Sequence, residues 1–534
     1  MSPVLFNIFI NDVFEGAGNL GVKVRHGYKP PGNMRKREKL PDRFPGLLFA
    51  DDLVTFSATR TKLKAMCAHI ENWTKANEME CGIVKCGIMV INGDMARLRR
   101  RSLEFKIAGE AVPIVDEYSY LGVTITPDLS IGAMAQVGLK KGEATHTAIR
   151  PFLGCSDIPL FIRKHILTSV VLPRMLYGAE LYGMNKKLTD KFQQLLDRSL
   201  KVILGVNPKA PVSKLVLWEE FNIPPISALA AARRARAFQK AASLKTKIAL
   251  LVTHPYRCAK WTWSTGTLRW LKTQITRCRA RMATIPQVFT DDTWLGLEAK
   301  VLGQRIVGLV WEREKLLRAN INDSSRAYVK YKYAANRLTS AQVGNFPMYN
   351  KGFACIAKAR AGAIWWANKL AMLQMIHQQY VTRCPCCGED EPETLIHALT
   401  KCARWEGMRA SMLEGWVGAS LTHLLTGMED ASEEAKAILL LGGEWNGRSL
   451  QPWPFNWRFE PSADNPELYG PELNLEGEMI PVGGIQECVC LRVAIFFQTM
   501  IPARAAIIRA LRDPVGAAGD VDATSSSESQ SSNG

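Results

Sequence analysis

Residues 47–56, LLFADDLVTF, place two adjacent carboxylates, Asp51 and Asp52, inside an apolar run with the composition of a β-strand. A negative charge taken out of water is costly unless a cation or a hydrogen-bond donor pairs with it. Successive side chains of a regular strand point to opposite faces, so neighbouring aspartates cannot both face one ion from it. The arms GLLFA and LVTF therefore predict a hairpin with both carboxylates at its tip. The tip is either an exposed acidic turn or a site that holds a cation.

Helices are predicted on both sides of this hairpin in the sequence. In SPVLFNIFINDVF, residues 2–14, Ser2 can cap a helix, Pro3 suits its first turn, and apolar residues recur on one face. Residues 59–76 repeat apolar side chains at helical spacing and predict a second helix. Three short strands are expected at 88–91, 103–107 and 120–125. This first part of the chain is thus predicted to mix α and β structure.

Beyond residue 130 the pattern predicts helices almost throughout, and one segment is strongly basic. Residues 221–290 contain no acidic residue but 13 lysines and arginines, together with three tryptophans. Basic side chains can neutralise phosphates while aromatic rings accept stacked bases. Alternatively, these are helices whose charges pair with acidic residues elsewhere in the fold. The candidates for nucleic-acid contact in this segment are Arg233, Arg234, Arg236, Lys260, Trp261, Trp263, Arg269 and Trp270.

Composition restricts the class of protein. The chain has 534 residues, enough for several domains, and a net charge of +18 that favours a polyanionic partner. Its 13 cysteines follow no regular framework, and the apolar N-terminus lacks a basic leader, so reduced cysteines in an intracellular protein are expected. No uncharged apolar run is long enough to span a bilayer, and no membrane partner is expected.

Residues 49–52, FADD, resemble the catalytic hairpin of reverse transcriptases, in which an aromatic and a variable residue precede two aspartates. Four residues alone are weak support for a family, but the neighbouring segments match it in order and spacing. Upstream, SPVLFNIFINDVF is similar to the family's helix that packs against template and incoming nucleotide, with Ser2 and Pro3 at its start. The non-LTR, LINE-type retrotransposon enzymes match best.

Three segments downstream extend the resemblance. NEMECGIVKCGIMVI is similar to the family's segment that carries a lysine, here Lys85. YSYLGVTI resembles the primer grip at Tyr120, Leu121 and Gly122. VVLPRMLYGAELYG, residues 170–183, resembles the thumb region.

This resemblance implies an RNA-directed DNA polymerase of a non-LTR retrotransposon. Asp51 would bind one of two Mg²⁺ ions, Asp52 would support it at the metal, and Lys85 would protonate the departing pyrophosphate. Phosphoryl transfer needs positioning and charge neutralisation, which two Mg²⁺ ions held by carboxylates supply. The partners would be an RNA template, a DNA primer or target, and deoxynucleoside triphosphates. An acidic turn and an ordinary surface lysine are the alternatives for these residues.

One expected part of the active site does not occur in the sequence. The family uses a further aspartate on a strand that precedes the SPVLF helix, and no aspartate followed closely by AFD occurs in the chain. We therefore expect a C-terminal part of a longer reading frame that cannot polymerise DNA unaided. The alternative is a non-catalytic RNA- or DNA-binding remnant of such an element.

A second motif, CPCCGEDEPETLIHALTKC, combines four potential metal ligands. Cys384 and Cys387 form a Cys-x2-Cys pair, and His397 and Cys402 follow one helical turn apart, so the four can surround a zinc ion. Cys386 is an extra thiol that could take the place of Cys387. The pattern resembles the terminal zinc knuckle of the same enzymes, with a structural role. Two basic residues beside it are expected to contact RNA, namely Lys401 and Arg404.

The predicted fold class is α+β: an incomplete right-hand polymerase palm, then a mostly helical thumb and C-terminal region with a small zinc knuckle. Nuclear localisation with cytoplasmic passage would fit such an element. The predicted domains are a partial palm at 1–128, a thumb-like region at 129–220, a basic helical region at 221–375, the CCHC knuckle at 376–410, a helical region at 411–512 and a disordered tail at 513–534.

Overall fold

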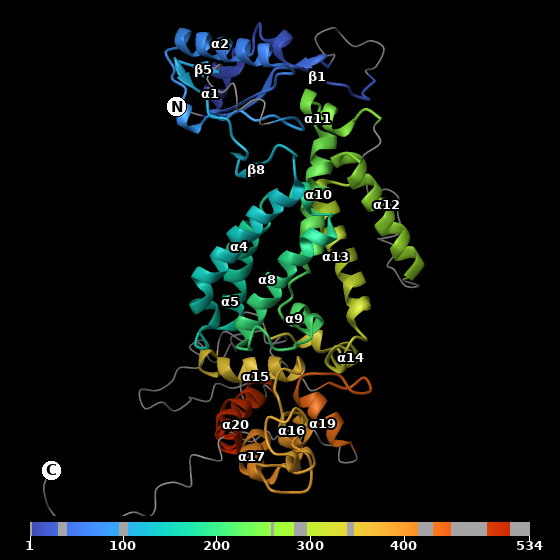
Figure 1. Cartoon of the computed structure of the whole chain (residues 1–534). Coiled ribbons are helices and arrows are strands. Elements are labelled where there is room, and N and C mark those ends of the chain that lie inside the picture. Colours follow the sequence, from blue (N-terminus) through green and yellow to red (C-terminus); the bar gives the residue numbers. More distant parts are fainter. Residues whose placement is uncertain are drawn as a thin grey trace, which may run out of the picture. The chain divides into compact units, whose positions relative to one another are not determined.

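The computed structural model describes residues 3–29, 40–94, 105–257, 261–281, 296–338, 346–414, 431–449 and 489–512. Within these ranges the protein is mixed α+β and mostly helical, with four two-stranded antiparallel sheets (Figure 1). The predicted α+β class is confirmed. Ser2, Lys260 and the tail from residue 513 onward lie outside the described residues.

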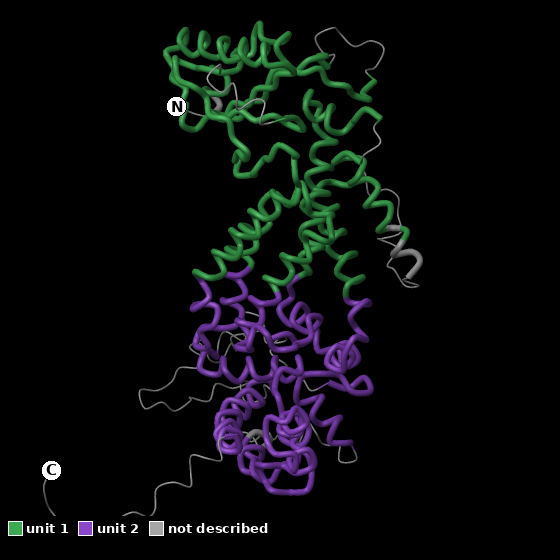
Figure 2. The backbone as a smooth tube through the Cα atoms, in the orientation of Figure 1, with its two compact units in different colours: residues 1–148, 168–196, 224–314 green, residues 149–167, 197–223, 315–534 purple. Residues whose placement is uncertain are grey.

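Contacts divide the chain into two compact units, each assembled from segments that are distant in the sequence (Figure 2). The long helices α4 (Ile131–Gly154) and α8 (Lys186–Leu204) contribute residues to both units. The six predicted domains divide the chain along the sequence instead, and their boundaries stay a prediction. Unit 1 comprises residues 1–148, 168–196 and 224–314, and unit 2 comprises residues 149–167, 197–223 and 315–534.

The N-terminal part of unit 1 builds a small core around the LLFADDLVTF stretch. Its elements are helix α1 (Pro3–Phe9), the 3₁₀ turn η1 (Ile10–Asp12), helix α2 (Arg60–Ala76) and strands β3 (Gly46–Phe49) and β4 (Asp52–Thr55). Ile10, Val13 and Ile70 are buried together, and Leu48 and Leu53 of the two strands pack against them. Both predicted helices are therefore present, and their apolar faces cover the strands beside the two aspartates.

Short antiparallel strand pairs make up the remaining β structure of this part. They pair β1 (Val22–Lys23) with β2 (Arg43–Phe44), β5 (Lys106–Ile107) with β6 (Glu110–Ala111), and β7 (Tyr118–Tyr120) with β8 (Val123–Ile125). The strand predicted at 88–91 is wrong, because Ile88 forms only an isolated bridge with Ile114. The strand predicted at 120–125 is confirmed only in part, since Tyr120 ends β7 and residues 123–125 form β8. Leu121 and Gly122 have φ angles of 49° and 74°, so the chain turns there into a hairpin.

Helices form the rest of unit 1, as the sequence predicts beyond residue 130. Ala231 and Ala235 of α10, Leu271 of α12, and Ile306 and Leu309 of α13 share one buried apolar cluster. The helical elements are η2 (Gly18–Leu20), η4 (Ile83–Lys85), α6 (Leu172–Met175), α7 (Ala179–Tyr182), α10 (Ile226–Ser243), α11 (Lys247–Thr253), α12 (Trp263–Arg281) and α13 (Ala299–Arg318), the last ending in unit 2.

Unit 2 is helical among its described residues. Helix α20 packs against α15 and α17. A Cβ atom at Gly352 of α15 would lie 2.0 Å from the carbonyl oxygen of Ala494 in α20, so glycine permits this close contact. The elements are α5 (Leu160–Ile166), the π-helical turn η6 (Leu167–Val171) at the border of unit 1, α9 (Lys214–Glu220), α14 (Asp323–Lys330), η9 (Tyr333–Asn336), η11 (Pro347–Tyr349), α15 (Asn350–Arg360), α16 (Ala367–Met372), η12 (Gln378–Val381), η13 (His397–Lys401), η14 (Ala403–Trp405), α17 (Glu406–Glu414), α19 (Glu433–Leu440) and α20 (Val489–Arg512).

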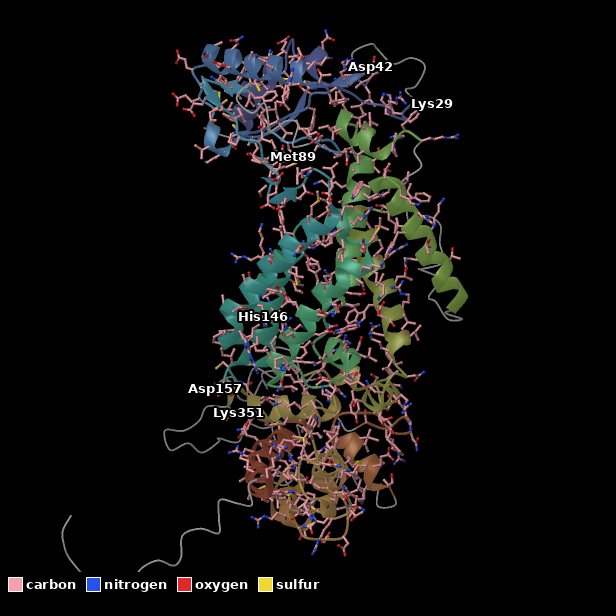
Figure 3. The ribbon with its side chains drawn as sticks, in the orientation of Figure 1. Lys29, Asp42, Met89, His146, Asp157 and Lys351 are labelled. Atoms are coloured by element: carbon pink, nitrogen blue, oxygen red, sulfur yellow. The ribbon has the colours of Figure 1, made fainter. Side chains whose placement is uncertain are left out.

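A buried ion pair joins distant segments of unit 2. Arg360 Nη1 lies 3.0 Å from Glu220 Oε1, and the two side chains are 0% and 3% exposed. Tyr328 and the backbone N–H of Leu338 also donate hydrogen bonds to the Glu220 carboxylate. Burial opposes the charge of Arg360, but Glu220 and nearby groups outweigh it and raise the pKa of Arg360. An exposed pair of the same unit, Lys351 with Asp157 at 3.4 Å, can be compared in Figure 3.

Helix α20 is long and apolar enough, by length and composition alone, to cross a membrane. Many of its residues are buried against the rest of unit 2, and Arg504 in its middle is paired with a carboxylate. These contacts are those of a core helix in a folded unit.

Candidate active site and candidate metal centre

The two aspartates lie at the tip of a tight hairpin, as the sequence predicts. Phe49 pairs with Asp52 across the two strands, which leaves Ala50 and Asp51 as the two-residue turn. Ala50 has a φ of 53°, a left-handed conformation that such a short connection requires. Both carboxylates are exposed. The hairpin therefore presents two negative charges to solvent from a base that is packed in the core.

The segment that carries Lys85 and the predicted primer-grip segment lie next to each other. The hydroxyl of Tyr118 donates a hydrogen bond to the carbonyl oxygen of Lys85 at 2.8 Å. Burial raises the pKa of Tyr120, and the negative charge of Asp52 adds to this rise. The structure thus places the β7–β8 hairpin within electrostatic reach of the FADD hairpin and in contact with the turn of Lys85. The Lys85 side chain is exposed, and its role as a proton donor stays a prediction.

The turn between β7 and β8 is held by the segment that resembles a thumb. The Tyr177 hydroxyl donates a hydrogen bond to the carbonyl oxygen of Leu121 at 2.7 Å, and Lys141 Nζ lies 3.5 Å from the carbonyl oxygen of Gly122. A shallow pocket opens beside this turn, lined by Gly122, Tyr177, Lys141 and their neighbours. Two segments that the sequence suggested separately are therefore adjacent.

Magnesium fits this hairpin only in part. Asp51 and Asp52 could each offer a carboxylate oxygen to Mg²⁺. The described residues contain two groups of three or more potential metal ligands. Both groups lie between residues 384 and 402, and neither includes Asp51 or Asp52. The hairpin carboxylates thus lack a third donor there, and they do not form a complete site for two ions.

The residues proposed from the basic segment fall into two groups. Arg233 and Arg234 donate hydrogen bonds to the carbonyl oxygens of Leu176 and Leu181 in the same unit. The Trp263 indole donates to the carbonyl oxygen of Glu180, and Trp270 packs against the cluster shared by α10, α12 and α13. Arg236, Trp261 and Arg269 are exposed instead. Nucleic-acid contact by any of these residues stays a prediction.

The four predicted ligands Cys384, Cys387, His397 and Cys402 come together in unit 2 as one group. Their potential ligand atoms all lie within 4.8 Å of one another. Cys384 Sγ is 3.9 Å from Cys402 Sγ, and Cys387 Sγ is 3.4 Å from His397 Nε2. Three sulfurs and one imidazole nitrogen at these separations form a group that can hold a metal ion.

A π-helical turn brings the second pair of ligands together. His397 and Cys402 are five residues apart, and in an α-helix this spacing would leave them about 140° apart around the axis. The chain instead forms η13, in which the N–H of Cys402 donates to the carbonyl oxygen of His397 at 2.7 Å. The predicted single helical turn is therefore a wider π turn. The motif alone gave no indication of it.

Charged neighbours orient the histidine ligand. Glu391 Oε2 lies 3.1 Å from His397 Nδ1, which leaves Nε2 directed toward the thiols. A carboxylate on the far nitrogen is the usual partner of a metal-binding histidine. The proximity of Cys384, together with Glu391, raises the pKa of His397 although burial lowers it. Lys401 pairs with Glu391 at 2.8 Å, while Arg404 lies exposed near the ring of Trp405.

Cys386 lies beside the four ligands but outside the group that they form. Its Sγ lies 3.4 Å from Glu393 Oε1, and the neighbouring Cys384 together with burial raises the pKa of the Cys386 thiol. The thiol can therefore donate a hydrogen bond to the carboxylate. The predicted ambiguity between Cys386 and Cys387 is resolved in favour of Cys387 as the ligand.

Glu393 and Arg504 connect this motif to helix α20. The fully buried Glu393 carboxylate accepts two hydrogen bonds from the Arg504 guanidinium, at 2.7 and 2.8 Å, and one from the N–H of Ala367 at 2.7 Å. Arg504 also donates to the carbonyl oxygen of Trp365. Sequence reasoning missed this pair, because the residues are more than a hundred positions apart and no local pattern joins them.

Replacing Arg504 with lysine should loosen this connection. Lysine keeps the positive charge but cannot form the two parallel bonds to Glu393 together with the bond to Trp365. We expect a loss of about 1–3 kcal/mol in the free energy of unfolding of unit 2. Urea titration followed by circular dichroism measures it, with the exposed Arg509→Lys in the same helix as the control. Equal stability of both variants would mean that the pair does not hold α20 in place.

No protein-family model matches this sequence, and no curated protein matches it either. The resemblance to reverse transcriptases therefore depends on the motifs and on how the structure arranges them.

Proposed function

We propose that this chain comes from an RNA-directed DNA polymerase of a non-LTR retrotransposon. In this proposal the hairpin of Asp51 and Asp52 contributes metal-binding carboxylates, and the turn of Leu121 and Gly122 contacts the primer. Lys85 serves as the proton donor to pyrophosphate. Magnesium, when bound, would neutralise charge on the transferred phosphoryl group.

One observation carries this proposal: segments with four separate resemblances are adjacent in the structure. The helix of residues 3–12 packs on the FADD hairpin, and the Lys85 turn accepts a bond from Tyr118 of the primer-grip hairpin. Tyr177 of the thumb-like segment holds the turn of that same hairpin. Adjacent segments with separate resemblances to one enzyme family support the proposal better than any one of them alone.

We also propose that the metal centre binds zinc in a structural role. Structural zinc sites have four ligands, and Cys₃His is one of the usual sets. Thiolates favour zinc over magnesium or calcium. Lys401 and Arg404, which are exposed beside the centre, are proposed to contact RNA.

Crosslinking from the end of a primer tests the polymerase role. A DNA primer with a photoreactive 3′ nucleotide, annealed to an RNA template, should crosslink to residues 49–52 and 118–122 in a Mg²⁺-dependent manner. Replacing both Asp51 and Asp52 with asparagine should remove that dependence, whereas the exposed Glu110→Gln should not. Crosslinks that avoid both segments, although the template–primer is bound, would contradict the proposal.

We further propose that residues 1–534 alone do not extend a primer, because two hairpin carboxylates do not hold two metal ions. Two carboxylates offer too few oxygen ligands to fix two Mg²⁺ ions in place. An extension assay on a primed RNA template with Mg²⁺ measures this directly. Clear extension would refute it.

The second candidate function is nucleic-acid binding without catalysis. The incomplete set of carboxylates around the hairpin favours it for this polypeptide. Binding with a steep dependence on salt, without primer-end crosslinks or extension, would support this candidate over the polymerase.

A further inference from the structure

Two segments of unit 1 that are more than two hundred residues apart form one surface beside α11. The N–H of Gly27 donates a hydrogen bond to the carbonyl oxygen of His254 at 2.8 Å, and His26 forms an antiparallel bridge with Pro255. A Cβ atom at Gly27 would lie 2.9 Å from the carbonyl oxygen of Pro255, so glycine permits this approach. The contact places residues 22–28 against the chain that leaves α11. Lys29, at the end of this described segment, is labelled in Figure 3.

Two exposed aromatic rings in the chain that follows α11 lie next to arginines. Trp261 is 64% exposed, and the guanidinium carbon of Arg269 lies 4.5 Å from the centre of its ring. Tyr256 is 53% exposed, and the guanidinium carbon of Arg25 lies 6.0 Å from its ring centre. We call these four residues the arginine–aromatic surface. Trp263, in contrast, is held by a hydrogen bond to a backbone carbonyl.

The charge on this surface is not neutralised within the described part of the protein. Among the described residues, no carboxylate forms an ion pair with Arg25 or Arg269. Neither of the chain segments 22–28 and 254–272 contains an aspartate or glutamate. Both guanidinium groups are therefore available to an anionic ligand.

We propose that the arginine–aromatic surface binds single-stranded nucleic acid. Exposed rings accept unstacked bases, while arginine contributes both a flat stacking partner and a charge for phosphate. Bases in a duplex are already stacked on each other, whereas the bases of a single strand are free to stack on these rings. Five positions separate Tyr256 from Trp261, so their Cα atoms lie at most about 18 Å apart, within reach of one short strand. The inference rests on the second candidate function, nucleic-acid binding without catalysis, and assigns it a site and a type of strand.

Fluorescence anisotropy with the full chain tests this role. The probes are a labelled, unstructured twenty-nucleotide DNA strand, the same sequence as a duplex, and vesicles of phosphatidylserine and phosphatidylcholine. We expect Trp261→Ala to weaken single-strand binding roughly tenfold with an unchanged dependence on salt, because it removes stacking alone. Arg269→Ala and Arg25→Ala should each lower the slope of log K against log salt by about 0.7.

Two exposed residues of unit 2 provide matched controls. Leu317→Ala removes a partly exposed apolar side chain, and Arg326→Ala removes one exposed positive charge. Neither should change affinity more than twofold, and circular dichroism should show that all variants are folded. The proposal would be overturned if the variants of the surface bound the single strand with the same affinity as the controls. It would also be overturned if the protein bound the vesicles but not the strand. Because primer-end crosslinks report on residues 49–52 and 118–122, failure here is distinguishable from failure of the polymerase proposal.

Discussion

Replacing Cys384 with serine is expected to abolish zinc binding at the proposed centre and to unfold the segment from residue 384 to 405. The four ligand atoms lie within 4.8 Å of one another, and the thiol sulfurs can lie this close as thiolates only when a cation separates their charges. Zinc contributes on the order of 10 kcal/mol to the folding of small knuckles, so loss of one ligand has a large effect. His397→Ala should have the same result.

Cys386 provides a matched control for this experiment. It is a neighbouring cysteine that lies outside the group of four ligands and donates a hydrogen bond to Glu393, so Cys386→Ser should keep the metal. Zinc content of the purified proteins and the absorption spectrum of the cobalt-substituted forms measure occupancy, and limited proteolysis measures unfolding. Equal zinc in Cys384→Ser and the parent protein would rule out the assignment. Loss of zinc in Cys386→Ser would instead indicate that this thiol is a ligand.

Replacing Glu220 with alanine is expected to lower the free energy of unfolding of unit 2 by about 3–5 kcal/mol. The substitution leaves the charge of Arg360 buried without its partner, since this guanidinium is 0% exposed. It also removes the acceptor for the Tyr328 hydroxyl and for the N–H of Leu338. The urea concentration at the midpoint of unfolding, followed by circular dichroism, measures the loss.

Two comparisons separate this effect from a general loss of charge. Lys351→Ala breaks an exposed pair with Asp157 of the same unit, and we expect a change below about 1 kcal/mol. Combining Glu220→Leu with Arg360→Met should cost less than the sum of the two single changes, because no unpaired buried charge remains. A loss after Glu220→Ala no larger than that of Lys351→Ala would show that the buried pair does not stabilise the unit.

The hairpin at Asp51 and Asp52 and the four metal ligands were predictable because their signals are local. Apolar arms on either side of two aspartates define a turn within ten residues, and the spacing of Cys384 and Cys387 defines one knuckle. The uninterrupted strand predicted at 120–125 is not found, because a contact with a distant segment determines the conformation there. β-branched and aromatic residues favoured an extended chain, but Leu121 takes a positive φ while Tyr177 binds its carbonyl oxygen.

The sequence by itself determined which residues can carry chemistry and which elements form around them, since side-chain type, apolar period and turn residues act over a few positions. Tertiary structure alone decided their environment. It separated exposed Trp261 from packed Trp263 and paired Glu393 with Arg504. Trp263 bonds to Glu180, 83 positions away, and Arg504 lies 111 positions from Glu393, so no pattern within one segment contains this information.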